Sequence, residues 1–296
     1  MSRNKLNTSK VSTTLTYIAL FIFLIWVLTP FYVIIANSIT PVGEYMSTKN
    51  FIAIPTKISL EAFIEIFNPP SDLQATNLVN GVSLILTGYW NMIWQTVPKA
   101  IISLFASGLT AYAYCKLRFP GKNLLFNIQI ATMMLPLGVL TIPSYIFYSK
   151  IGWVGAQGIL ALIVPGLFAG AGTIFFLRQY FEGIPNEIIE AARVDGLGEV
   201  GIFFKIMLPL AMPAFVAQFI LGFIGGYNSY TGPLLYLAGV KELYPLQLVF
   251  TDAWNYGNND ALRAAVVVFS LIPIILIYLF GQKFFIGGIT AGAVKG

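Results

Sequence analysis

The sequence predicts an all-α membrane protein with six transmembrane helices and with both termini in the cytoplasm. Of its 296 residues, 17 are Lys or Arg and 12 are Asp or Glu, which is 10% of the chain, whereas soluble domains contain about 25% charged residues. Hydrophobic residues make up 57%, and they occur in runs long enough for a helix to cross a bilayer. This composition is typical of proteins that fold in lipid.

The scarcity of reactive side chains excludes several classes of enzyme and metal site. Histidine is absent and Cys115 is the single cysteine, so a Ser-His-Asp triad, a structural zinc site and an internal disulfide bond are all excluded. The net charge is +5, but no block of five or six basic residues occurs, which argues against nucleic-acid binding. We expect no catalytic, cofactor-binding or metal-binding residues in this chain.

Six apolar runs, each bounded by charged residues, Pro or Gly, predict the six spans. The first follows a basic tail, residues 1–14, and it is too long for the apolar part of a signal peptide, so we expect it to stay as a membrane anchor. The predicted spans cover residues 15–36, 92–114, 123–145, 157–176, 207–224 and 264–280.

The distribution of Lys and Arg orients these spans. The N-terminal tail, the turn at 115–122, the stretch 177–206 and the segment 281–296 together hold 11 of the 17 basic residues. Cytoplasmic loops of membrane proteins collect Lys and Arg. We therefore expect these four segments, including the C-terminal tail 283–296, to lie in the cytoplasm.

Two longer loops are expected on the opposite, extracytoplasmic side. The loop 37–91 is longer than a connection requires, and Glu61 and Glu65 lie four residues apart among apolar residues, which predicts a short helix at 59–67. The loop 225–263 is rich in aromatic and amide side chains. These side chains either form an interfacial aromatic belt or contact a polar ligand or a partner protein, and both interpretations stay open.

The most densely charged part of the chain is residues 178–205, which carry eight charged side chains. Pro185 suits the first turn of a helix, and Gly196 can adopt the left-handed conformation that ends one. The sequence therefore predicts a helix over 185–196 and a second short helix over 199–207.

The charges of the first of these helices favour a protein partner over a lipid surface. Glu190 and Arg193 are three residues apart and can pair. The helix carries three acids and one base, namely Glu187, Glu190, Asp195 and Arg193. A helix that lies on anionic lipid normally has more Lys and Arg than acid on its polar face, so we expect a partner protein with basic residues.

The same stretch resembles the signature of the permease subunits of ATP-binding cassette importers. That signature is Glu-Ala-Ala, three residues, Gly, nine residues and then Ile-x-Leu-Pro, and the matching residues here are Glu190, Ala191, Ala192, Gly196, Ile206, Leu208 and Pro209. Further matches point to the carbohydrate-uptake branch and to the smaller, six-span membrane subunit of maltose-type importers. They lie at residues 111–113, 118–122, 184–185 and 292–296.

The resemblance implies a transmembrane core at 92–282 with coupling helices at 185–207. In such importers two copies of a cytoplasmic ATP-binding subunit bind ATP and Mg, and a cleft in one of them receives the stretch that matches residues 190–209. The signature residues then form the ATPase-coupling element, with Phe203 and Phe204 packed beside them. The chain has no phosphate-binding loop of the G-x-x-x-x-G-K-[ST] type, so we expect a non-catalytic subunit that binds no cofactor itself.

The resemblance further implies a second homologous permease subunit and an extracytoplasmic solute-binding protein. Residues 227–263 of the second long loop occupy the place of the family segment that reaches into the binding protein. The candidate residues for the substrate path or for this contact are Lys99, Tyr227, Asn228, Tyr230, Trp254 and Tyr256. Many relatives carry Trp-Asn-Glu where this chain has Tyr227, Asn228 and Ser229, so the resemblance supports the Asn and not a neighbouring acid.

Lys99 is the one charged residue inside the predicted span 92–114. A lone ammonium group is costly in hydrocarbon, so this side chain either snorkels towards the membrane surface or faces water in the substrate path. An acidic sugar would fit the second interpretation.

The resulting expectation is a permease subunit for a sugar or oligosaccharide in the bacterial cytoplasmic membrane. The alternatives are a permease for a polyol phosphate or an acidic saccharide and, in a different class, a stand-alone ion-driven carrier. Such a carrier usually has Asp or Glu within its spans, and the six spans contain none. The two halves of the chain also lack the internal similarity of many such carriers.

Overall fold

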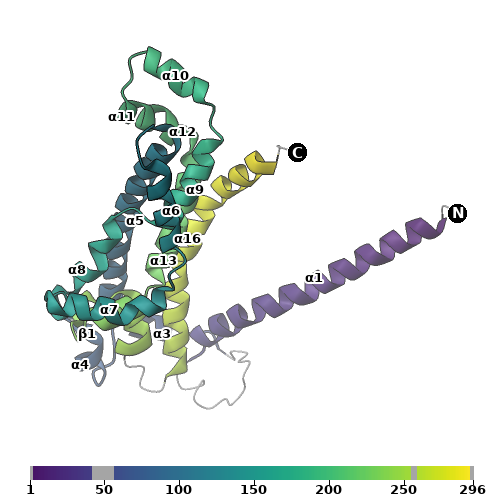
Figure 1. Ribbon diagram of the computed structural model, residues 1–296. Coiled ribbons are helices and arrows are strands. Elements are labelled where there is room, and N and C mark those ends of the chain that lie inside the picture. Colours follow the sequence, from purple (N-terminus) through teal and green to yellow (C-terminus); the bar gives the residue numbers. More distant parts are fainter. Residues whose placement is uncertain (1–2, 42–56, 255–258, 294–296) are drawn as a thin grey trace. The chain divides into compact units, whose positions relative to one another are not determined.

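The computed structural model describes residues 3–41, 57–254 and 259–293, and these residues are mostly helical (Figure 1). They fold into two compact units. The first unit comprises the residues up to Leu78 together with Trp254–Leu271, and the second comprises Val79–Ala253 together with the residues from Ile272 onward. The predicted all-α fold is confirmed, since the strands in the described part of the chain are two residues long.

The first unit contains one long helix, two short helices and the beginning of a second long helix. Its elements are α1 (Arg3–Ser38), α3 (Glu61–Phe67), α4 (Gln74–Asn77) and the first turns of α16 (Asp260–Ala293). α1 includes the predicted first span, and most of its large apolar side chains are exposed, as expected of a lipid-facing helix. α3 confirms the short helix predicted at 59–67: Ala62 and Ile66 are buried, and the ring of Phe67 meets that of Phe269 edge to face, with centroids 5.3 Å apart.

The second unit is organised around α5 (Leu84–Lys116), which contains the predicted second span. A hairpin of β1 (Leu78–Val79) and β2 (Val82–Ser83) precedes it. α5 packs against α9 (Ala171–Glu182) and α13 (Met212–Tyr227) (Figure 1). Their shared core lies near the C-terminal end of α5 and includes Leu177, Phe181, Phe203, Met207 and Phe215.

Two of the predicted spans are interrupted, although we expected single helices. The third consists of α6 (Lys122–Thr132) and α7 (Leu137–Lys150), which are separated at Pro136. The fourth consists of η1 (Gly155–Gln157), α8 (Gly158–Ile163), η2 (Pro165–Leu167) and α9. Proline has no backbone N–H and its ring clashes with the preceding turn, which accounts for a break at Pro136 and at Pro165.

The helices predicted at 185–196 and 199–207 are confirmed. They are α10 (Asn186–Val194) and α11 (Glu199–Ile202), the latter continued by the π-helical turn η3 (Phe203–Met207). The predicted fifth span, 207–224, is bent. The helical segment Glu199–Leu210, which ends with α12 (Leu208–Leu210), meets α13 at an angle of 81°. α10 and α11 lie at one end of the second unit, and α7 and α8 lie at the other (Figure 1).

Short helices follow α13 in the second unit. These are α14 (Thr231–Tyr236), η4 (Lys241–Leu243), α15 (Leu246–Leu248) and η5 (Val249–Ala253). Among the described residues, three segments are long and apolar enough to cross a membrane, namely Thr13–Ser38, Gly155–Glu182 and Asp260–Gln282, and the bent pair of α11–α12 with α13 is a fourth.

Candidate functional site

Local sequence signals fix both ends of α10. The helix begins after Pro185, and Glu187 places a carboxylate in its first turn, where the helix dipole favours negative charge. At the other end Gly196 has a φ of +84°. Its N–H donates to the Arg193 carbonyl at 3.1 Å, and the next N–H, that of Leu197, donates to the Ala192 carbonyl at 3.0 Å. This is a Schellman motif, and it needs the left-handed conformation that glycine adopts without strain.

The two faces of α10 have different surroundings. Ile189 and Ala192 are buried in the core of the second unit, whereas Glu190 and Ala191 are exposed. The signature residues therefore divide: Ala192 attaches the helix to the membrane core, and Glu190 and Ala191 form a surface that another protein can reach.

The C-terminal end of α10 is joined to α5 through Glu199. Its carboxylate accepts hydrogen bonds from Arg193 Nε at 2.9 Å and from Arg193 Nη2 at 3.3 Å. It also accepts a hydrogen bond at 2.5 Å from the Tyr112 hydroxyl of α5. The hydrogen bonds from Arg193 and then from Tyr112 lower the pKa of Glu199 below its usual value. The spacing allowed Arg193 to pair with Glu190, but its ion pair in the structure is with Glu199, which the turn at Gly196 brings to the guanidinium group.

The N-terminal end of α10 is joined to the same helix by Lys116. Its ammonium group donates to the Ile184 carbonyl at 2.7 Å and to Asn186 Oδ1 at 2.8 Å. The last two turns of α5 thus hold the start of α10 through Lys116 and its end through Tyr112 and Glu199. We call these three residues the α10 anchors.

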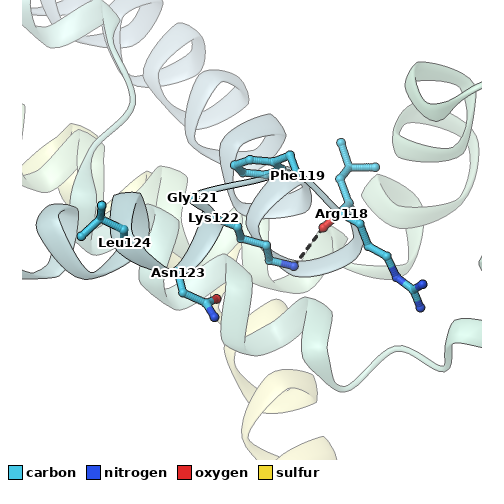
Figure 2. Close-up of a pocket in the computed structure, with 7 residues that line it drawn as sticks. Arg118, Phe119, Gly121, Lys122, Asn123 and Leu124 are labelled. Atoms are coloured by element: carbon cyan, nitrogen blue, oxygen red, sulfur yellow. Dashed lines mark hydrogen bonds between the residues drawn. The ribbon is translucent and has the colours of Figure 1, made fainter.

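A basic, concave surface lies beside α10, at the turn between α5 and α6. Lys122 stabilises this turn, because its Nζ donates to the carbonyls of Leu117 at 3.0 Å and Cys115 at 3.2 Å. Figure 2 shows Lys122 reaching back to the turn while Arg118 points away from it. A cavity of about 690 Å³ extends from this turn to Asn186 and Glu190 of α10.

The remaining signature residues lie in η3 and α12, between α11 and α13. Phe203 is fully buried, and its ring contacts those of Tyr112 and Phe215 with centroids 5.8 and 6.4 Å apart. Phe204 is 46% exposed and packs edge to face on Phe203. Ile206 and Leu208 are half-buried beside the same core, and Pro209 is exposed.

Comparisons with known proteins identify the family. Residues 105–290, more than half of the chain, match the model of a family described as binding-protein-dependent transport system inner membrane component. The chain belongs to this family. It is a multi-pass permease of the cytoplasmic membrane, as predicted from the signature at Glu190–Pro209.

The relatives of this permease cover nearly all of its length. It is 33% identical to the arabinooligosaccharides transport system permease protein AraQ of Halalkalibacterium halodurans, over 89% of both chains. It is 30% identical to the polygalacturonan/rhamnogalacturonan transport system permease protein YtcP of Bacillus subtilis, over 95% of this chain and 97% of that one. A solved bacterial ABC transporter that imports the acidic polysaccharide alginate has a chain with a TM-score of 0.79 and 26% identity, covering 96% of this permease and 99% of that chain.

The candidate path residues of the permease fall into both units. Tyr227 is buried at the end of α13, and the amide oxygen of the exposed Asn228 is 3.5 Å from Gln247 Nε2. Tyr230, half-buried, precedes α14 in the same unit. Trp254 is buried in the first unit, and Tyr256 lies outside the described residues.

Lys99 has a partner that neither interpretation of the sequence foresaw. Its Nζ lies 3.4 Å from the carbonyl of Leu162 in α8, and its methylene groups occupy the space where a side chain at Gly166 would lie. A backbone carbonyl is a common partner for a charged group within a membrane protein.

Sequence reasoning missed the α10 anchors as a group. Tyr112 and Lys116 are four residues apart on α5, which places them on one side of that helix. This spacing was the available signal, but their partners are 87 and 68 to 70 residues away. In the described residues no group of three or more Asp, Glu or Cys side chains could hold a metal ion.

Proposed function

We propose that this permease forms, with a second homologous subunit, the path by which an ATP-driven importer takes up an oligosaccharide. A solute-binding protein delivers the saccharide, and two copies of a cytoplasmic ATP-binding subunit supply the energy. The relatives support the saccharide: AraQ is named for arabinooligosaccharides, YtcP for polygalacturonan and rhamnogalacturonan, and the solved relative imports alginate.

The proposed topology has six spans with both termini in the cytoplasm. The tail 1–14 precedes a first helix at 15–36, an extracytoplasmic loop at 37–91 follows, the core extends over 92–282, and 283–296 is a cytoplasmic tail. The positive charge of the turn that carries Lys116, Arg118 and Lys122 supports this orientation. In this topology the interrupted third and fourth spans cross the membrane as bent segments, which is tolerated where other helices cover the break.

The observation that carries the coupling role is the attachment of α10 to α5 at both ends. Lys116 holds the start of α10, and Tyr112 holds its end through Glu199. Because both ends of α10 are attached to α5, a displacement of α10 also displaces α5. The exposed Glu190 and Ala191 are the proposed contact with the ATP-binding subunit, which binds ATP and Mg. Ile189 and Ala192 face the core and connect this contact to the membrane helices.

A second candidate function is uptake of an acidic saccharide. It is favoured by the relatives named for polygalacturonan and alginate. Aromatic rings can stack on the faces of sugars, and amides can form hydrogen bonds with their hydroxyl groups. The proposed side chains of the path or of the binding-protein contact are therefore Tyr227, Asn228, Tyr230, Trp254 and Tyr256. The net charge of +5 does not oppose an acidic solute.

The test is reconstitution of the purified complex in proteoliposomes, with the binding protein, ATP and two labelled probes: an arabino-oligosaccharide and an oligogalacturonate. The account predicts uptake of at least one probe that requires ATP, the binding protein and the co-purified ATP-binding subunits. Uptake by this chain alone, driven by an ion gradient, would contradict the proposal.

A further inference from the structure

A row of polar side chains runs along α5 at four-residue intervals. Residues four apart form one continuous ridge that winds slowly around a helix. The members of this row are Asn91, Gln95, Lys99, Ser103 and Ser107. Asn91, Gln95 and Ser107 are buried. We call these five residues the α5 polar row.

The first two members bind the backbone of the loop that precedes α15. Asn91 Nδ2 donates to the carbonyls of Glu242 at 2.7 Å and Tyr244 at 3.1 Å, and Gln95 Nε2 donates to the Leu243 carbonyl at 2.8 Å. Three consecutive carbonyls of η4 and its end therefore have partners on α5. Irregular backbone is costly in a membrane protein unless its polar groups are satisfied in this way.

The other three members bind the interruption between α8 and α9. The ammonium group of Lys99 is 3.4 Å from the Leu162 carbonyl. Ser103 Oγ donates to the Phe168 carbonyl at 2.8 Å, and Ser107 Oγ accepts from the Gly170 N–H at 2.9 Å. These partners lie on both sides of the break at Pro165, one at the end of α8 and two in the extended segment between η2 and α9.

Gly166 brings the interruption close to α5. A Cβ at this position would overlap the methylene groups of Lys99, so the glycine allows the Lys99 side chain to lie flat against η2. The aliphatic part of Lys99 thus packs on the break while its charged end approaches the last turn of α8, where the carbonyls carry the negative end of the helix dipole.

We propose that the α5 polar row positions the two irregular segments, residues 162–170 and 242–244, so that they move together with α5 during transport. This inference rests on the proposed coupling role of α10. The C-terminal end of α5 carries Tyr112 and Lys116, which hold α10, and the preceding turns carry the row. A displacement of α10 therefore reaches both irregular segments through a single helix.

The experiment measures the number of ATP molecules hydrolysed per saccharide imported by the reconstituted complex. Ser103→Ala removes one donor from the row. Its matched control is Thr110→Ala, because Thr110 is also half-buried on α5 but its hydroxyl donates to Ala106 of its own helix at 2.8 Å. Ser107→Ala removes the acceptor of the Gly170 N–H. Ser103→Thr keeps the hydroxyl.

We expect Ser103→Ala and Ser107→Ala to raise the ATP used per saccharide about two- to tenfold, the change that corresponds to one lost hydrogen bond. Assembly with the ATP-binding subunits and ATPase activity should persist. Thr110→Ala and Ser103→Thr should keep the wild-type ratio. A wild-type ratio in Ser103→Ala and Ser107→Ala, or an equal rise in Thr110→Ala, would overturn the inference. Failure of the proposed function is a separate result, since it would show as no ATP-dependent uptake by the wild-type complex.

Discussion

Glu199 is the residue through which three parts of the permease meet. It joins Arg193 of α10 to Tyr112 of α5, and it stands at the start of α11. A carboxylate can accept several hydrogen bonds at once, and bonds to a charged group are about twice as strong as neutral ones. This single side chain therefore joins the end of α10 to α5.

The lowered pKa of Glu199 predicts an effect of acid on stability. A group whose pKa is depressed by folding stabilises the folded state above its unfolded pKa, near 4.5, and loses this contribution as the pH falls through the folded pKa. We expect the Tm of the wild-type permease to approach that of Glu199→Gln as the pH falls from 7 to 3. A difference in Tm between the two proteins that does not change with pH would contradict this explanation.

The hydroxyl of Tyr112 can be removed without the ring. Tyr112→Phe keeps the contact with Phe203 and deletes the hydrogen bond to Glu199, so we expect saccharide import to fall roughly three- to tenfold while the complex still assembles. Tyr114→Phe is the control, because the ring of Tyr114 packs on Phe119 and Phe126. Initial rates of uptake in proteoliposomes measure the effect, and equal rates in both variants would argue against the anchor.

At the level of elements, α10 depends on the turn that ends it. Gly196→Val places a β-branched residue at φ +84°, a conformation that costs L-residues about 1–2 kcal/mol. We expect import to fall at least fivefold and the ATP-binding subunit to co-purify less well. Gly198→Ala is the matched control, since Gly198 has a φ of −73° and open space around it. The measurement is uptake together with subunit stoichiometry, and normal import in Gly196→Val would contradict the role of this turn.

The elements show which parts of the structure could be predicted from the sequence. The ends of α10 were predictable because Pro185 and Gly196 act locally. The breaks at Pro136 and Pro165 were not predicted, because a run of apolar residues meets the length criterion for a span whether or not proline interrupts it. The ion pair of Arg193 with Glu199 was not predicted, because spacing along a helix favours Glu190 and it is the turn at Gly196 that brings Glu199 to the guanidinium group.

The site was predictable to a similar extent. The signature at Glu190, Ala191, Ala192 and Gly196 predicted two helices that the structure contains, and their coupling role stays a prediction. The anchors and the α5 polar row depend on contacts between residues that are far apart in sequence, such as Asn91 with Glu242. Serine, asparagine and lysine every four residues along an apolar helix were the available signal for the row.

For the whole molecule, the proposed topology places α3 on the extracytoplasmic side of the membrane and α10 in the cytoplasm. In a Cys115→Ser background, Glu61→Cys and Asp195→Cys each introduce one thiol at an exposed position. A membrane-impermeant maleimide added to intact cells should label Glu61→Cys and not Asp195→Cys, and opened membranes should allow both to react. Labelling of Asp195→Cys in intact cells would show that α10 lies on the extracytoplasmic side, and this would contradict the proposed orientation.

The central claim is that the exposed face of α10 binds an ATP-binding subunit, and a photo-cross-linker at Ala191→Cys tests it most directly. The reagent is attached to the assembled complex in a Cys115→Ser background, with Ile58→Cys, 78% exposed in the wild type, as the control. The account predicts a cross-link from position 191 to the ATP-binding subunit and none from position 58. A cross-link to that subunit from position 58, or only to lipid from position 191, would contradict it.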